Sequence, residues 1–333
     1  MVSVDSHTQS TNNLSRVYPL IDTHTHFDAS IFDDDKALLA QQAYAQGVRH
    51  LVLVGYLHQY FERMYETEQQ LKTQWQSSII ATNHQNESHT DIHIALGLHP
   101  FYIKQHNEDH LKDMSTMIAE RHPLAIGEIG LDTFTDEMKE PDIFAKQVQF
   151  FKAQLDLAVT HQLPVLLHIR KAHAEALAIL KAHDYNAHEL GGIAHSFSGG
   201  VQEAKAFVKL GFKLGVTGQI TNPNAKKLRR AIQAAVASHG IECLVIETDC
   251  PDMTPIMCQT ANNSSVLDSS VHDSPIHDSP IHDSSFHDRN VPANLPWVLL
   301  SLSELLDVSP TVLAEQLWHN SCSALQTTWF YPQ

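Results

Sequence analysis

Short apolar runs recur along the chain, and a longer helix-like stretch separates most of them from the next. A short apolar run bounded by polar or turn-forming residues is typical of a buried strand. The pattern predicts eight strands: Leu20–His24, His50–Val54, Ile92–Gly97, Leu124–Glu128, Val165–His168, Gly192–His195, Phe212–Val216 and Cys243–Glu247. It predicts helices at 34–46, 58–75, 107–121, 141–161, 172–183, 201–210, 225–238, 293–306 and 310–325.

The order of these elements indicates the fold class. Strands that alternate with helices pair in parallel, and eight of them within about 230 residues predict an α/β protein with a closed (β/α)8 TIM barrel. Such barrels place their chemistry at the C-terminal mouth of the strands. A doubly wound open sheet is the alternative, but it usually has a Gly-rich turn after its first strand. This chain has HTHFD at residues 24–28 in that place.

Three segments depart from the alternation of strands and helices. Residues 1–17 are polar and predict a disordered N-terminal tail, which leaves residues 18–333 for the barrel. Residues 76–91 predict a polar loop before the third strand. Residues 259–288 are of low complexity and end in an approximate five-residue repeat, VHDSP, IHDSP, IHDSS, FHD. Because this composition cannot build a core, we expect a flexible surface loop inserted into the barrel.

Charge and composition exclude several classes of protein. The chain has 22 Lys and Arg against 38 Asp and Glu, a net charge of −16, which excludes a strongly basic nucleic-acid platform. Its 24 histidines explain a pI of about 5.8 despite that charge. The four cysteines are scattered, the first residues lack an apolar leader, and no run reaches the roughly 20 apolar residues of a membrane span. We therefore expect a cytoplasmic protein without a membrane partner.

Imidazole and carboxylate side chains gather where the predicted strands end. His24 and His26 share one face of the first strand because strand side chains alternate. Four more candidates follow at the ends of later strands: Glu128, His168, His195 and Asp249. Each of them alone could instead cap the helix that follows. Together, and without thiolates, they suit Zn²⁺, Mn²⁺ or Mg²⁺ in an open catalytic site.

Two further residues at this end of the barrel are candidates for substrate binding. Arg170 follows His168 by two residues and could contact phosphate, or it could pair with an acidic neighbour. His99, in the sequence GLHP, could face the substrate or hydrogen-bond its own loop. Lys171 and His173 are weaker candidates for the same role.

Seven motifs, taken in order, resemble the signatures of the TatD-related metal-dependent deoxyribonucleases, which are amidohydrolase-like metal-dependent hydrolases. They are DTHTHFD, GLHP, GEIGLD, PVLLHIR, HSFSGG, ETDCPDM and RNVPANLP. The chain departs from the family at Thr25 and Ser196, where relatives often have cysteine, and at the 259–288 insertion, where relatives usually have a short loop.

The resemblance implies a (β/α)8 barrel that binds two divalent metal ions. It assigns His24, His26, Glu128 and Asp249 to one ion, with Glu128 bridging to a second ion that His168 and His195 complete. Glu247 would be the ligand of a third ion.

The expected function is a divalent-metal-dependent hydrolase, in particular a TatD-type deoxyribonuclease with 3′–5′ exonuclease-like activity. Two metal ions would activate a water molecule, with Asp249 as the base and Glu128 as the shared catalytic ligand. The acidic net charge favours a DNA or other phosphodiester substrate held over a short footprint. No obligate protein partner is evident from the sequence.

Two alternatives remain open at this point. An amidohydrolase or an esterase, such as a deacylase of mischarged tRNA, could use the same ligands, although Glu128 stands where many amidohydrolases have a modified lysine. A metal-buffering protein, suggested by the His-Asp repeat, is the other alternative.

Overall fold

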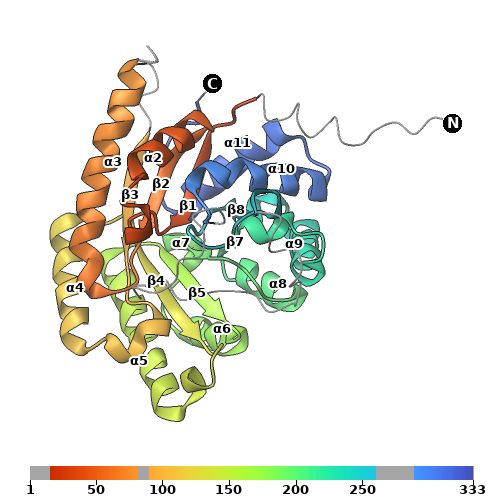
Figure 1. Cartoon of the computed structure of the whole chain (residues 1–333). Helices are drawn as coiled ribbons and strands as arrows, with labels where there is room; N and C mark the ends of the chain where they lie inside the picture. The colour runs from red at the N-terminus through yellow and green to blue at the C-terminus, as the bar shows by residue number, and fades with distance from the viewer. Residues whose placement is uncertain (1–15, 82–89, 260–288, 333) are drawn as a thin grey trace.

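The computed structural model describes residues 16–81, 90–259 and 289–332. Eight parallel strands pair in chain order from β1 to β8, and the helices surround them (Figure 1). The strands are β1 (Leu20–Thr25), β2 (Val48–Val54), β3 (Asp91–Leu96), β4 (Ala125–Asp132), β5 (Val165–Arg170), β6 (Ile193–Ala194), β7 (Lys213–Val216) and β8 (Leu244–Ile246). The predicted TIM barrel is therefore confirmed.

The first and last strands meet through side-chain and loop hydrogen bonds. The Thr23 hydroxyl donates to the Ile246 carbonyl over 3.2 Å. The amide of Asp249 donates to the His24 carbonyl over 2.9 Å. These contacts bring the C-terminal ends of β1 and β8 together and nearly close the barrel.

The helices form the outer layer of the barrel. They are α2 (Lys36–Ala45), α3 (Phe61–Ala81), α4 (Glu108–Arg121), α5 (Pro141–His161), α6 (His173–Ala182), α7 (Ala187–Leu190), α8 (Val201–Lys209), α9 (Lys226–His239), α10 (Leu295–Leu306) and α11 (Pro310–Ala324). In α9 the buried residues recur at helical spacing, as Leu228, Ala231, Ile232 and Ala235. The nine helices predicted from the pattern are present within a few residues, and α7 is an addition.

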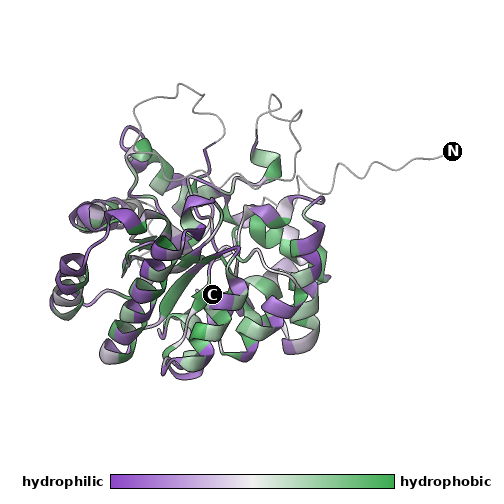
Figure 2. Cartoon of the chain, turned by 90° about the horizontal axis from the view of Figure 1, so that it is seen from below, coloured by the Kyte–Doolittle hydropathy of each residue, from purple (hydrophilic) through white to green (hydrophobic). Residues whose placement is uncertain are grey.

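Alternate residues of each strand face different parts of the core. In β2, Leu51 and Leu53 pack toward the helices, whereas Val52 and Val54 join a small cluster inside the barrel. Figure 2 shows the hydrophobic colour along the central strands and hydrophilic colour on outer turns of the helices. The apolar residues inside the barrel leave its C-terminal mouth to polar side chains.

Several predicted boundaries differ from those of the structure. The expected loop at 76–91 begins as helix, because α3 continues to Ala81 through a stretch without Gly or Pro, and it ends in β3 at Asp91. The fourth and fifth strands extend to Asp132 and Arg170, which pair in register, so Glu128 lies inside its strand. The expected tail and insertion fall largely at 1–15 and 260–288, outside the described residues.

Among the described helices, none is both long and apolar enough to cross a membrane alone. The segments Pro292–Leu306 and Pro310–Ala324 reach that length and composition only as a pair bent by 112°. Leu299, Leu302 and Leu313 of these segments are buried in the fold.

Candidate metal centre

Two imidazoles and two carboxylates converge at the mouth of the barrel. His24 Nε2 lies 3.4 Å from His26 Nε2 and 3.2 Å from Glu128 Oε2. His26 Nε2 lies 3.5 Å from the same Glu128 oxygen. Asp249 Oδ1 lies 3.8 Å from His24 Nε2 and 3.9 Å from His26 Nε2. Strands β1 and β4 and the turn after β8 thus place four potential ligand atoms around one point.

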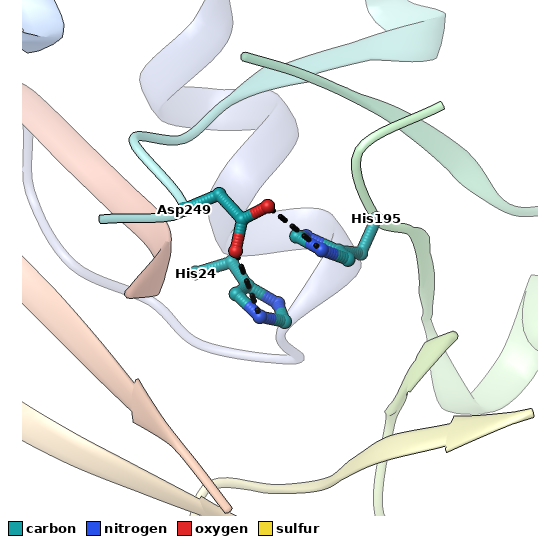
Figure 3. Close-up of side chains that lie close together, drawn as sticks. All are labelled: His24, His195 and Asp249. Carbon is teal, nitrogen blue, oxygen red and sulfur yellow. Dashed lines mark ion pairs between the residues drawn. The ribbon is translucent and has the colours of Figure 1, made fainter. Parts of the chain in front are cut away.

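The second oxygen of Glu128 faces a different set of imidazoles. Glu128 Oε1 lies 2.6 Å from His168 Nδ1 and 3.5 Å from His195 Nε2. His195 also reaches the first group, because its Nε2 is 3.4 Å from Asp249 Oδ2 and its ring stacks on His24 with centroids 3.4 Å apart. Figure 3 shows Asp249 between His24 and His195. The six residues predicted as metal ligands therefore form one cluster.

The spacing of these atoms suits a small cation. Four ligands at about 2.1 Å from a tetrahedral ion are separated by about 3.4 Å, close to the separations around His24 and His26. The ligand atoms of His24, His26 and Glu128 form one compact group, and those of His24, His195 and Asp249 form another. All of these residues are buried. The donor set therefore fits divalent metal ions, with imidazole and carboxylate as the ligands.

Hydrogen-bond partners indicate which ring nitrogen of each histidine is available to a metal. His26 Nδ1 donates to the Val54 carbonyl over 3.0 Å, and His168 Nε2 donates to Asp132 Oδ2 over 3.1 Å. A proton held on one nitrogen leaves the lone pair on the other, which in both residues faces Glu128. These two rings therefore have the orientation that metal ligands need.

His195 has a comparable neighbour on its outer side. Its Nδ1 lies 2.9 Å from Glu247 Oε1, and the contact is an ion pair rather than a well-aligned hydrogen bond. The other ring nitrogen, Nε2, faces Glu128 and Asp249. A proton on Nδ1 is thus favoured by Glu247, which keeps Nε2 available.

His99 has the opposite arrangement. Its Nδ1 accepts a hydrogen bond from the Phe101 amide over 3.0 Å, so the proton of the neutral ring lies on Nε2. His99 Nε2 is 3.3 Å from Glu128 Oε1. Although the ligand atoms of His99, Glu128 and His168 lie close together, His99 is oriented as a hydrogen-bond donor at this site.

Glu247 and Asp132 both act on the rings of the cluster. The carboxylate of Glu247 accepts hydrogen bonds from the Ser196 amide over 2.5 Å and from the Thr23 hydroxyl over 3.1 Å. These contacts fit an orienting role for Glu247, and its role as a ligand of a third ion stays a prediction. Asp132 is not among the predicted site residues. Its position four residues after Glu128 in one strand, on the same face, is the signal that could have found it.

Arg170 lies beside the cluster. Its guanidinium carbon is 3.5 Å from the centroid of the Phe134 ring, and Lys171 Nζ is 4.4 Å from that centroid. Asp132 joins this loop to the cluster, because its Oδ1 accepts a hydrogen bond from the Phe134 amide over 2.7 Å. His173 lies further out, at the first residue of α6, with its ring near Phe197.

The electrostatics of the cluster favour charged carboxylates. Burial raises the pKa of Glu128, but His99, His24, His195 and His168 lower it well below its ordinary value. Burial lowers the pKa of His168, but Glu128 and Asp132 raise it to about 9. Carboxylates that stay charged beside several imidazoles form a site in which a divalent cation can bind.

The backbone after β8 is constrained at Asp249. This residue has φ of 55°, a left-handed conformation that is uncommon for a residue with a side chain. The RNVPANLP segment braces the turn, because Asn290 Nδ2 donates to the Thr248 carbonyl over 2.8 Å and the Asn290 amide to the Pro251 carbonyl over 2.9 Å. The segment therefore supports the turn that carries Asp249.

Comparison with known proteins decides the family. The family profile described as TatD related DNase matches residues 21–326. The chain belongs to this family. Over 236 residues, 70% of this chain and 80% of the relative, it is 36% identical to YjjV of Escherichia coli K12, a protein named as a metal-dependent hydrolase.

One further relative and one solved structure extend the comparison. Over 237 residues, 71% of this chain and 80% of the relative, the chain is 28% identical to the protein of Cronobacter sakazakii named 3'-5' ssDNA/RNA exonuclease TatD. The crystal structure of YjjV, described as a TatD homologue, matches with a TM-score of 0.69 at 30% identity, covering 93% of this chain and 98% of that one. The chain is a metal-dependent hydrolase of the TatD family.

Proposed function

We propose that this TatD-family hydrolase is a phosphodiesterase that uses two divalent metal ions to remove nucleotides from the 3′ end of single-stranded DNA. The observation that carries the proposal is the position of Glu128, whose two oxygens face two different sets of imidazoles. The relative named 3'-5' ssDNA/RNA exonuclease TatD supports the substrate class.

The residues divide into two sets of ligands. His24, His26 and Asp249 would hold one ion, His168 and His195 would hold the other, and Glu128 would bridge them. Divalent ions at such a site acidify a water molecule and offset negative charge on a phosphoryl oxygen. The same donor set suits Mg²⁺, Mn²⁺ or Zn²⁺.

The remaining chemistry falls to side chains of the chain itself. Asp249 would accept the proton of the attacking water as the new P–O bond forms, and would return that proton to the 3′ oxygen as the old P–O bond breaks. His99, with its Nε2 proton directed into the site, and the guanidinium of Arg170 would donate to the phosphoryl oxygens. Asp132 and Glu247 would hold His168 and His195 in place.

A second candidate function is hydrolysis of a carboxylic ester or a C–N bond, by an activity such as deacylation of mischarged tRNA or an amidohydrolase reaction. The same ligands would serve, because an activated water attacks carbonyl and phosphoryl centres alike. Arg170 and Lys171 at one side of the cluster favour the phosphodiester, which carries a negative charge that an amide lacks.

A substrate panel tests the proposal. The protein would be incubated with 5′-labelled single-stranded DNA, duplex DNA, mischarged tRNA and a cyclic amide, each with Mg²⁺, Mn²⁺ or Zn²⁺. We expect a ladder of 5′-labelled products shortened from the 3′ end of the single strand. Glu128→Gln should abolish the ladder, whereas the same substitution at the exposed Glu304 should not. Faster release of amino acid from tRNA, or of product from the amide, would contradict the proposal.

A further inference from the structure

Basic residues are concentrated at the start of α9. The sequence Lys226-Lys227-Leu228-Arg229-Arg230 holds four of the chain's 22 basic residues in five positions. Leu228 is buried, and Lys226, Lys227 and Arg230 are exposed. Because residues three and four apart share one face of a helix, these three cations project from the same surface.

Like several other lysines and arginines, these three cations have no Asp or Glu oxygen at ion-pair distance in the described part of the chain. Glu203 lies close enough to Lys227 for their charges to interact. No acidic residue lies in the first turn of α9, and within the described ranges Lys226, Lys227 and Arg230 make no ion pair with Asp or Glu. Elsewhere, acidic residues pair with Lys36, Lys72, Lys104, Lys112, Lys139, Arg63, Arg121 and Arg289. What sets these three apart is their concentration, because three exposed cations fall within five positions of a chain with an acidic excess of 16.

This surface lies at the mouth of the barrel. Helix α9 follows β7, so its first turn is at the C-terminal end of the strands, and α8 packs beside it (Figure 1). Lys227 Nζ donates to the Ser198 carbonyl over 3.4 Å, and Ser198 is three residues after His195. Burial lowers the pKa of His173. The nearby Glu203 carboxylate raises this pKa, and the nearby Lys227 ammonium lowers it. Lys227 is therefore close to the segments that follow both β5 and β6.

The positive charge continues toward the candidate metal centre through the segment after β5. Lys171 and Arg170 lie over the Phe134 ring, next to the loop that Asp132 joins to His168. On the other side of the mouth, after β1, the cations Lys36, Arg63 and Arg289 are each paired with Asp33 or Asp35. Lys171, Lys226, Lys227 and Arg230 thus lie on the side of the mouth formed by β5, β6 and β7, and among the described residues none of the four makes an ion pair with Asp or Glu.

We propose that Lys171, Lys226, Lys227 and Arg230, which we term the β5–β7 rim, bind the phosphates of a single-stranded nucleic acid on the 5′ side of the scissile bond. The proposal rests on the proposed exonuclease function, in which the 3′ end occupies the metal centre and the rest of the strand must leave across the mouth. A few cations placed on one side suffice for this, because each phosphate contact adds affinity by releasing counterions.

The test compares two charge-matched triple variants. The rim variant is Lys226→Gln, Lys227→Gln, Arg230→Gln, and the control is Lys72→Gln, Lys112→Gln, Arg121→Gln on α3 and α4, on another side of the barrel (Figure 1). In the full-length enzyme, kcat/KM would be measured for a 12-nucleotide strand and for a dinucleotide. We expect the rim variant to lower the kcat/KM for the strand, relative to the kcat/KM for the dinucleotide, about tenfold at low salt. The slope of log binding constant against log salt concentration, measured for the strand, should become shallower by about 2. We expect the control to leave both unchanged.

Binding of a fluorescent 12-nucleotide strand, measured by anisotropy without added metal, separates this proposal from the proposed function. Weaker binding by the rim variant than by the control would support the rim even if the protein cleaved no nucleic acid. Equal strand binding by the two variants would overturn the proposed rim. So would a loss of kcat/KM in the rim variant that is the same for the strand and for the dinucleotide.

Discussion

A single methyl group added at Gly215 should disturb the candidate metal centre from behind. Gly215 lies in β7, and a Cβ atom there would fall 2.3 Å from Glu247 Oε1 and 2.6 Å from its carboxyl carbon. Because ordinary contacts begin near 3.4 Å, the carboxylate would have to move by about 1 Å. Glu247 is fully buried and holds Ser196, Thr23 and His195, so it has no free space into which to move.

The expected result of Gly215→Ala is a folded protein with a weakened metal site. Overpacking of this kind costs about 1–3 kcal/mol of stability. Displacement of the carboxylate that orients a metal-binding histidine typically costs about 10–100-fold in metal affinity. We therefore expect kcat/KM at limiting metal to fall by a similar factor and to recover in part at saturating metal.

Isothermal titration with Mn²⁺ or Zn²⁺, together with thermal unfolding, measures both effects. Gly200→Ala is the matched control, because its added Cβ meets only Glu203 Oε2 at 2.9 Å among close contacts, and that side chain can rotate. Wild-type metal affinity in Gly215→Ala would refute the view that Glu247 positions His195. A loss of equal size in both variants would refute it as well.

Three further predictions concern individual side chains. Asp249→Asn should remove most hydrolysis even with metal in excess, because an amide cannot accept the water proton, while metal content measured by mass spectrometry should fall only in part; near wild-type turnover would exclude Asp249 as the base. Asp132→Asn should weaken metal binding about 10–100-fold, measured by titration, because His168 loses its charged partner. Burial and then the Lys72 charge lower the pKa of His93 to about 3, so the unfolded chain binds a proton that the folded chain does not, and stability is lost as pH falls from 6.5 toward 3. Urea unfolding should show that His93→Gln removes up to about 2 kcal/mol of the stability difference between pH 7 and pH 5, and an unchanged difference would contradict this.

The strands and the six clustered side chains were predictable because they depend on local features. Apolar runs mark buried strands, and residues at the ends of parallel strands meet at one mouth whatever the details of pairing. His24 and Asp249 could therefore be placed together although they are 225 positions apart in the chain.

The orienting residues depend on the register between strands, which local patterns do not specify. Asp132 reaches His168 because β4 and β5 pair with Gly130 opposite His168 and Asp132 opposite Arg170. A shift of one residue would turn Asp132 to the other face of the sheet. The proton position on His99 likewise follows from one backbone hydrogen bond, donated by Phe101, that the sequence does not reveal.

The proposed function depends above all on two divalent ions held by the cluster around Glu128. Anomalous diffraction from crystals grown with Mn²⁺ tests it directly. Two peaks are expected to flank the Glu128 carboxylate, one beside His24 and His26 and the other beside His168. If both peaks were absent, or if the only peak lay far from Glu128, the two-ion site would be contradicted.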